Sequence, residues 1–548
     1  MQQNLNSSES EKSWFRRITE EKIAWLILSL VCALVFLLRL KFLSLPFDRD
    51  SGTYAWLGQQ LIEGKVPYVD FFEMKLPGLF ISFGVLLAIF GKTIQGLHLG
   101  FAFLNIASIL IFFQLLKRMF SPFAALFGAS AFAVISLHIF ADGLGTLSEP
   151  IVVFCFLGGW FFLAEFFYGK PLKTLLFLSG WMLMWGATVK QNGIFLLIIA
   201  CFFILFQTLF PKDPSRQKIE IRDLMIFGLG LMGPLFLQFL SIAIRGSVSE
   251  MIFWTFEVAQ AYVGHKTLAS GWERFISFGA LVGFHFREFF FAGVAGYLLM
   301  FFFKIPKSVK WFSVVFVFFS FVSIVPGLHF YPHYFFLIFP AWTFGIVLMY
   351  EELRLLFKKI LPEKIFPVVA GMGFISIFIF NPVYRNIYLA KIGPLDYCEN
   401  IFKGNPFAEA WVLSEIAKEK ARPGDKVYVF GSEPEIYFYL QLEAVTEHIT
   451  QSYWGVSRET EFRNVIMEQI ERKRPRFIFY VKNSYSVNIT EKDVYFVQWL
   501  MDYLLDNYYS LAVVDRTVKN KPNVVTGPKA LDYIPNGENF MILFERNP

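Results

Sequence analysis

The sequence predicts a mainly α-helical polytopic membrane bundle, with a small α/β domain at its C-terminal end. Three observations predict this fold class. Charged residues make up only 17% of the 548 residues, against about 25% in soluble domains. These charges form short islands between apolar runs of spanning or near-spanning length. After about residue 382 the long apolar runs stop, and short segments of strand and helix type alternate.

Eleven apolar runs are predicted to cross the membrane, within a range of 10–13 because spanning and interfacial helices have similar hydropathy. The predicted spans are 23–45, 96–116, 124–140, 150–167, 175–189, 194–210, 224–244, 289–303, 311–325, 335–350 and 365–380. Basic residues fill the N-tail 1–22 and the alternate loops, which indicates a cytoplasmic N-terminus. An odd number of spans then puts the C-terminal region outside.

The transmembrane domain is expected over 23–382, and its first outer loop, 46–95, is long and only partly polar. Residues 54–64 predict a short amphipathic helix that ends at Gly64. Residues 79–90 are apolar but few, which favours an interfacial helix. Further segments expected on the outer side are 141–149, 190–193, 245–288 and 328–334.

The C-terminal domain, 383–548, is predicted to contain a sheet covered by helices. Expected helices are 407–421, 433–440, 461–473 and 494–507, and expected strands are 426–431, 444–449, 476–481, 509–518 and 540–544. No glycine-rich phosphate loop follows the first strand, so a nucleotide-binding fold is not expected. The net charge of +6 is explained by basic loops that orient helices, and no nucleic-acid partner is expected.

Acidic residues gather on the predicted outer side together with basic and aromatic ones. The acids are Asp48, Asp50, Glu63, Asp70, Glu73, Asp142 and Glu149, and their expected companions are Lys75, Lys190, His333 and Tyr334. A carboxylate there can take a proton from an attacking hydroxyl, and the cations can offset charge on a departing phosphate. This combination at a membrane surface suits a phosphate-bearing lipid.

Each candidate also has a structural interpretation. Asp50 is favoured as a general base, and alternatively it caps a helix that opens near Ser51. Asp48 is the competing base, and alternatively it is a solvated turn residue. Lys75 contacts a donor phosphate or anchors its loop to lipid headgroups.

Farther along the chain the alternatives are similar. Glu149 positions substrate or pairs with a cation, and Lys190 and His333 bind substrate or serve as structural partners of the backbone or of acids. Three arginines of the second outer loop could also meet a phosphate, but their spacing selects none of them: Arg245, Arg274 and Arg287.

The first outer loop resembles that of the C-superfamily membrane glycosyltransferases. The resemblance rests on Asp50, Tyr54, Gly64, Pro67-Tyr68 and Lys75-Leu76-Pro77. It is greatest for the family 39-like branch of protein O-mannosyltransferases and lipid A aminoarabinose transferases. In that branch an Asp at the end of the first helix is the catalytic base, commonly followed by Glu, then a Tyr and a Lys-Pro pair.

The resemblance implies that Asp50 is the base and that Tyr54 and Lys75 bind substrate. Ser51 replaces the common Glu, and Leu76 separates Lys75 from Pro77. The missing acid weakens the case for a metal site. No cofactor is required by the sequence, and a divalent metal is left open.

Weaker matches continue along residues 20–380. The segments 146–150 and 189–193 add Glu149 and Lys190 to the expected substrate-binding residues, and a late histidine–tyrosine pair adds His333 and Tyr334. The segment 429–434 is similar to the soluble domain of bacterial members.

Together these features predict an inverting transferase in a bacterial cytoplasmic membrane, in contact with membrane lipids and with its C-terminal domain in the periplasm. Its donor would be a polyprenyl-phosphate-linked sugar, and its acceptor a hydroxyl of a lipid, glycan or protein. The alternative is a transporter or flippase of lipid-linked sugars. Transporters usually contain internal repeats with broken helices at mid-membrane, whereas the polar residues here gather at one surface. A third reading, a non-enzymatic scaffold, leaves the acid–base cluster unexplained.

Overall fold

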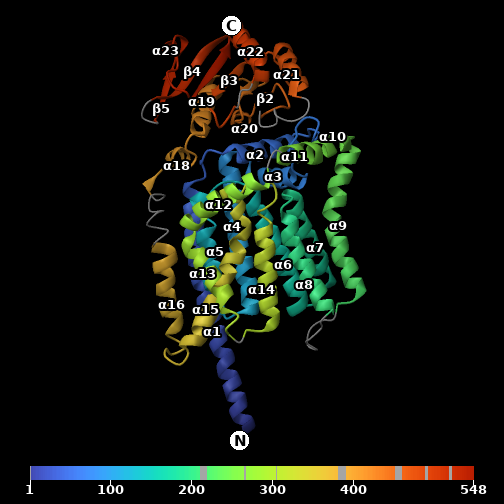
Figure 1. The fold of residues 1–548 in the computed structure, drawn as a ribbon, viewed down its shortest axis with the longest axis vertical. Coiled ribbons are helices and arrows are strands. Elements are labelled where there is room, and N and C mark those ends of the chain that lie inside the picture. Colours follow the sequence, from blue (N-terminus) through green and yellow to red (C-terminus); the bar gives the residue numbers. More distant parts are fainter. Residues whose placement is uncertain are drawn as a thin grey trace.

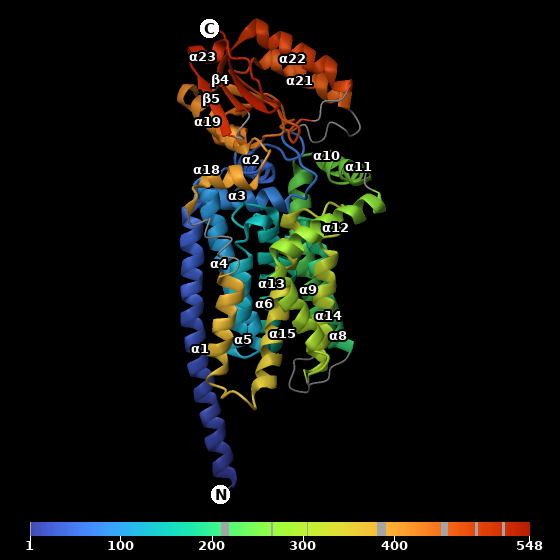
Figure 2. The ribbon, with the colours of Figure 1, turned by 60° about the vertical axis from the view of Figure 1, so that its left-hand side comes forward.

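The computed structural model describes residues 2–209, 219–264, 267–303, 305–380, 391–450, 459–487, 491–517 and 521–548. Long helices run side by side as a bundle, with the N-terminus at one end (Figure 1). The C-terminal sheet domain lies at the opposite end of the bundle. Short helices lie across the bundle between these two parts, and the rotated view shows the same three layers (Figure 2).

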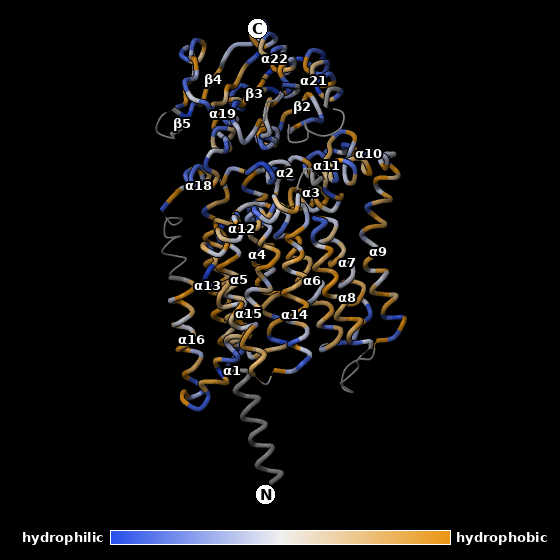
Figure 3. Tube along the Cα trace, in the orientation of Figure 1, coloured by the Kyte–Doolittle hydropathy of each residue, from blue (hydrophilic) through white to orange (hydrophobic). Residues whose placement is uncertain are grey.

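The bundle helices follow the predicted apolar runs in order. They are α1 (Gln2–Lys41), α4 (Ile94–Met119), α5 (Pro122–Ile135), α6 (Ser148–Tyr168), α7 (Lys173–Val189), α8 (Gly193–Leu209), α9 (Ile221–Ile244), α13 (Arg287–Leu299), α14 (Lys307–Val322), α15 (Phe339–Phe357) and α16 (Phe366–Phe374). Their middle parts are hydrophobic and their ends more polar (Figure 3).

Within the described residues, five helical segments are long and apolar enough to cross a membrane, or six spans if one bent pair counts as a span. The chain is therefore a multi-pass membrane protein. The count of eleven spans stays a prediction, and the predicted end of one span at residue 210 lies outside the described residues.

Helix α4 illustrates how local sequence sets the ends of these helices. The Thr93 side chain accepts a hydrogen bond from the backbone N–H of Gly96, which caps the first turn. Lys117 and Arg118 lie in the last turn, where positive charge offsets the negative end of the helix dipole.

Two helices of the predicted first outer loop, α2 (Arg49–Ile62) and α3 (Gly78–Phe90), lie across the end of the bundle under the C-terminal domain (Figure 1). Helix α3 has 13 residues, too few to span a bilayer, which agrees with the expected interfacial helix. The expected start of the preceding helix at residue 54 is wrong. Helix α2 begins at Arg49 because the side chain of Asp48 accepts a hydrogen bond from the N–H of Ser51 and caps the first turn.

The second long loop is also helical. It contains α10 (Val248–Ile252), the π-helix η2 (Phe253–Val258), α11 (Ala259–Gly264) and α12 (Leu268–His285). Helices α12 and α13 meet at 96°, so the chain turns sharply from this loop into the bundle. A 3-10 helix, η3 (Pro332–Ile338), precedes α15.

The C-terminal domain contains a six-stranded mixed sheet in the order β2-β1-β3-β6-β4-β5. Strand β1 runs parallel to β2 and β3, and β6 runs antiparallel to both β3 and β4. The strands are β1 (Lys426–Phe430), β2 (Glu443–Ala444), β3 (Phe477–Lys482), β4 (Tyr508–Thr517), β5 (Lys521–Thr526) and β6 (Phe540–Arg546). The helices are α18 (Pro394–Ile401), α19 (Phe407–Lys420), α20 (Glu435–Leu440), α21 (Glu459–Lys473), α22 (Val494–Asn507) and α23 (Pro528–Leu531).

The expected small α/β domain is confirmed, with two corrections in its sheet. Strand β5 was not expected, because Pro522 and Asn523 are residues that strands disfavour. They are tolerated because β5 is an edge strand that pairs with β4 alone. The expected strand 444–449 is reduced to the two residues of β2. The expected domain boundary at residues 382–383 lies outside the described residues.

Candidate active site

The first turn of α2 carries the two acids considered as bases. Asp48 is the N-cap, with its Oδ1 2.8 Å from the N–H of Ser51. Burial, and next the charge of Asp50, raise the pKa of Asp48 to about 6. The capping role considered for Asp50 therefore belongs to Asp48. Asp50, two residues later, is left for other contacts.

The loop after α2 is folded so that Lys75 is held close to the bundle. Tyr68 has a left-handed backbone, with a φ of 66°, and its buried hydroxyl donates to the carbonyl of Lys75 at 2.7 Å. The Gln191 side chain donates to the carbonyl of Met74 at 2.9 Å. Two hydrogen bonds from separate segments thus fix the backbone on which Lys75 stands.

A close backbone contact brings this loop against the end of α7. A Cβ atom at Gly78 would lie 2.3 Å from Oγ1 of Thr188, so only glycine fits. Because Thr188 lies two residues before Lys190, the contact brings Lys75 and Lys190 to the same region.

Lys75 is a partly buried cation with an acidic neighbour. Its Nζ lies 3.5 Å from Oε1 of Glu73. Burial is the largest single influence and by itself would lower the pKa of Lys75, but Glu73, Asp50 and Tyr334 together outweigh it and the pKa is raised. The side chain therefore stays protonated and can meet an anion.

A buried ion pair joins the C-terminal end of α7 to the N-terminal end of α6. Lys190, the C-cap of α7, pairs with Glu149 in the first turn of α6. The Nζ of Lys190 also lies 3.8 Å from the ring centroid of Tyr334. The Nε2 of His333 lies 3.9 Å from Oε1 of Glu149, so η3 completes the group.

Electrostatic interactions connect these groups to α2. Burial raises the pKa of Tyr54 well above its ordinary value, and the charges of Asp50, Glu73 and Glu149 raise it further. Three carboxylates from three separate segments therefore lie near one phenol. The ring of Tyr54 packs edge-on against Phe83 of α3.

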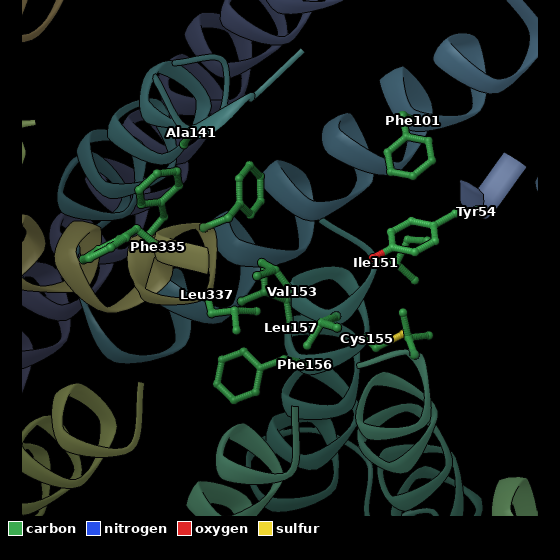
Figure 4. Packing of buried hydrophobic residues seen from close by; sticks show 14 of the residues in the cluster. Tyr54, Phe101, Ala141, Ile151, Val153, Cys155, Phe156, Leu157, Phe335 and Leu337 are labelled. Atoms are coloured by element: carbon green, nitrogen blue, oxygen red, sulfur yellow. The ribbon is translucent and has the colours of Figure 1, made fainter. Parts of the chain in front are cut away.

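Hydrophobic side chains of the bundle pack next to these polar residues. Figure 4 shows buried side chains of α6, among them Ile151 and Phe156, together with Tyr54 from α2 and Phe335 from η3. These residues belong to one continuous buried cluster. Close packing of this kind resists small displacements, so the polar groups above it are held in position.

The structure brings together the residues selected from the sequence: Asp48, Asp50, Tyr54, Lys75, Glu149, Lys190, His333 and Tyr334. Glu73 was noted only as an acid of the loop, and its spacing of two residues from Lys75 was the available signal. Of the three loop arginines, Arg245 donates to the carbonyl of Lys65 and Arg287 pairs with Glu288.

The arrangement can perform acid–base chemistry on an anionic substrate. The Asp50 carboxylate acts electrostatically on the partly buried Lys75, and the buried Lys190 stands on the neighbouring segment. A proton can therefore be accepted while negative charge is neutralised nearby. In the part of the chain that the structure describes, no group of three or more His, Cys, Asp or Glu side chains could hold a metal ion.

Solved structures of two proteins are similar to this chain over nearly its whole length. ArnT from Cupriavidus metallidurans bound to undecaprenyl phosphate aligns with a TM-score of 0.54 and 12% identity, over 94% of this chain and 97% of that chain. The apo state of ArnT gives 0.54 and 12%, over 95% and 98%. The apo oligosaccharyltransferase of Archaeoglobus fulgidus gives 0.49 and 11%, over 93% and 75%.

No family model matches the sequence, and no curated protein matches it. The likeness to ArnT confirms the fold that the resemblance to the C superfamily implied. The assignment to a family 39-like branch stays a prediction.

Proposed function

We propose that this chain, which has the fold of the C-superfamily membrane glycosyltransferases, transfers a sugar from a polyprenyl-phosphate donor to an acceptor hydroxyl. The reaction takes place on the outer face of a bacterial cytoplasmic membrane. The basic residues Lys117, Arg118, Lys170 and Lys173 lie at the ends of bundle helices opposite to Asp50, which favours this orientation. The C-terminal domain is then periplasmic.

Asp50 is the general base of this mechanism. Its carboxylate accepts the proton of the acceptor hydroxyl while the hydroxyl oxygen bonds to the anomeric carbon of the sugar. The bond between that carbon and the phosphate oxygen breaks on the opposite face, and polyprenyl phosphate leaves with the electron pair. The anomeric configuration is therefore inverted.

The two lysines stabilise the departing phosphate. The segments of Lys75 and Lys190 are in direct contact, since the Gln191 side chain donates to the carbonyl of Met74 and Gly78 packs against Thr188; in this mechanism both lysines meet the same phosphate. Glu149 holds Lys190 in position from α6, and His333 and Tyr334 close the site from η3. Cations aimed at developing charge in a site with little water are a major source of rate enhancement.

One observation carries this proposal. Acid, cation and aromatic side chains from α2, the loop after it, α6, α7 and η3 converge at a single end of the bundle. Buried charges are costly unless they are compensated, and charged groups within membrane proteins tend to be functional. A transferase for a lipid-linked anionic donor uses each of them.

The test is release of polyprenyl phosphate from a radiolabelled polyprenyl-phosphate sugar by the purified protein. Asp50→Asn should lower the release rate by about 100-fold or more, because general base catalysis contributes about 10²–10⁴-fold. Glu63→Gln, at the other end of α2, is the matched control, since Glu63 pairs with the exposed Lys92. It should keep the wild-type rate.

Two results would contradict the proposed role of Asp50. Release at the wild-type rate by folded Asp50→Asn would exclude Asp50 as the base. Loss of release in Asp48→Asn but not in Asp50→Asn would transfer the role to Asp48. In both cases the folded fraction is checked by size-exclusion chromatography in detergent.

A further inference from the structure

Helix α2 has two different faces. Positions 49, 52, 56 and 59 recur every three or four residues and so share one face, whereas Asp50 and Tyr54 lie on another. The face with Tyr54 is turned to α3, as the pairing of Tyr54 with Phe83 indicates, and Phe83 in turn packs against Phe101 of the bundle helix α4. The other face is covered by α20 of the C-terminal domain.

The contact between α2 and α20 extends from Phe47, just before α2, to Gln59. At its start, the N–H of Phe47 donates to the hydroxyl of Tyr439 at 2.7 Å. At its end, the side chain of Gln441 donates to Oε1 of Gln59 at 3.0 Å. Between them the rings of Trp56 and Tyr437 lie 6.1 Å apart.

The two helices also approach closely at Gly52. A Cβ atom there would lie 2.5 Å from the Cβ and 2.7 Å from the Cα of Glu435. Any larger residue would push α2 away from α20. The distance between the two helix axes is thus set by a glycine in the first turn of α2, two residues from Asp50.

An ion pair fixes the first turn of α2. The Nε of Arg49 donates to the carbonyl of Ser432 at 2.5 Å, and its Nη2 lies 3.3 Å from Oε1 of Glu433. Glu433 is fully buried. Its second oxygen accepts from the Ser486 hydroxyl at 2.6 Å, so Glu433 is held within the C-terminal domain before it meets Arg49.

We infer that the C-terminal domain positions the catalytic helix, with Glu433 as a positioning residue that fixes Asp50 through Arg49. This inference rests on the proposed function for its kinetic part. The geometry supports a direct effect, because Arg49 and Asp50 are adjacent and a rotation of the first turn moves both side chains. A displacement of about 1 Å at a reacting group can cost about 10²-fold in rate.

The first test compares Glu433→Gln with a matched control, Asp493→Asn. Asp493 forms another buried ion pair in the same domain, at 2.5 Å from Arg463, between α21 and α22. Glu433→Gln should lower kcat for polyprenyl phosphate release by about 10- to 100-fold. The KM for the donor should stay within about twofold, because Lys75 and Lys190 are untouched. Asp493→Asn should keep the wild-type kcat and KM.

The second test needs no activity. Hydrogen exchange of the backbone amides of α2 should be faster in Glu433→Gln and unchanged in Asp493→Asn, since local opening depends on the contacts that hold a segment. If Glu433→Gln does not fold, Arg49→Gln breaks the same pair from the other side, where the side chain is 25% exposed. The kcat of the double variant Arg49→Gln/Glu433→Gln should be no lower than that of the slower single variant, because both substitutions break the same pair.

The outcomes are distinct. Faster α2 exchange in Glu433→Gln alone supports the positioning role, even if the wild-type protein releases no polyprenyl phosphate, which would overturn only the proposed function. Wild-type α2 exchange in Glu433→Gln overturns the inference. An equal loss of kcat in Asp493→Asn also overturns it, because the effect would then be general destabilisation.

Discussion

The buried pair of Lys190 and Glu149 allows a sharp test of the site. We predict that Lys190→Met destabilises the protein, because it leaves the Glu149 carboxylate in a buried position without its main partner. The two residues are only 5% and 1% exposed. Removing one member of such a pair costs about 3–5 kcal/mol.

The lower end of that range is expected here. His333 lies 3.9 Å from the same carboxylate oxygen and offers a second, weaker source of positive charge. A loss of about 3 kcal/mol in a chain of this size corresponds to a fall in Tm of about 3 °C. The double variant Glu149→Gln/Lys190→Met has no buried charge left from this pair and should recover most of the lost Tm.

The assay is thermal unfolding in detergent, followed by tryptophan fluorescence, together with phosphate-lipid release. Lys92→Met is the matched control, because it removes a pair with Glu63 whose members are 38% and 37% exposed. Exposed pairs contribute about 0–1 kcal/mol, so its Tm should stay within about 1 °C. The double variant should regain stability but not activity. A Tm of Lys190→Met equal to that of the wild type would refute the reasoning.

Two further substitutions in the same region have definite expected effects. Asp48→Asn keeps a capping oxygen but removes a carboxyl whose pKa is raised to about 6 by burial first and a neighbouring acid second. Folding favours the protonated form of Asp48, so the wild type loses stability as pH rises from about 4 to 6. The variant should be about 3 kcal/mol more stable above pH 6 and equal below pH 4 in urea titrations. Tyr68→Phe removes the 2.7 Å hydrogen bond to the carbonyl of Lys75, which should cost about 1 kcal/mol and raise the donor Kd several-fold in filter binding. A stability difference between Asp48→Asn and the wild type that does not change with pH would contradict the first expectation. Wild-type donor binding by Tyr68→Phe would contradict the second.

The grouping of the site residues could be predicted because membrane topology constrains it. Hydropathy and basic loops decide which ends of the helices share a side, and the segments with Glu149, Lys190 and His333 were assigned to one side in this way. In a bundle, loops on one side lie in one layer, so residues hundreds of positions apart become neighbours. The contact of Lys190 with Glu149 shows that these two segments lie at the same end of the bundle.

Local detail was harder to predict, because it depends on single contacts. The start of α2 at Arg49 follows from one hydrogen bond between Asp48 and Ser51. Either acid could have capped a helix here, so the sequence alone left the roles of Asp48 and Asp50 open. The strand at residues 521–526 was missed because its pairing with β4 outweighs the low strand propensity of Pro522 and Asn523.

The pairing of Arg49 with Glu433 could not have been predicted. The two residues are separated by 384 positions, and no hydropathy pattern or motif connects a loop arginine with a glutamate in a distant soluble domain. The short-range signals in a single sequence are propensity, periodicity and charge, and none of these reports docking between domains.

This long separation has a consequence for biosynthesis. Helix α2 is made near the start of translation, whereas the residues that hold its first turn, 432 and 433, are made after some 380 more. At about 5–20 residues per second, α2 waits roughly 20–80 s for its partner. During that interval the early helices insert while the first turn of α2 lacks its anchor. The ribosome therefore completes the bundle before it completes the contacts that hold the proposed catalytic residue Asp50, and nascent chains that stop before α20 are expected to be inserted in the membrane with the first turn of α2 unanchored.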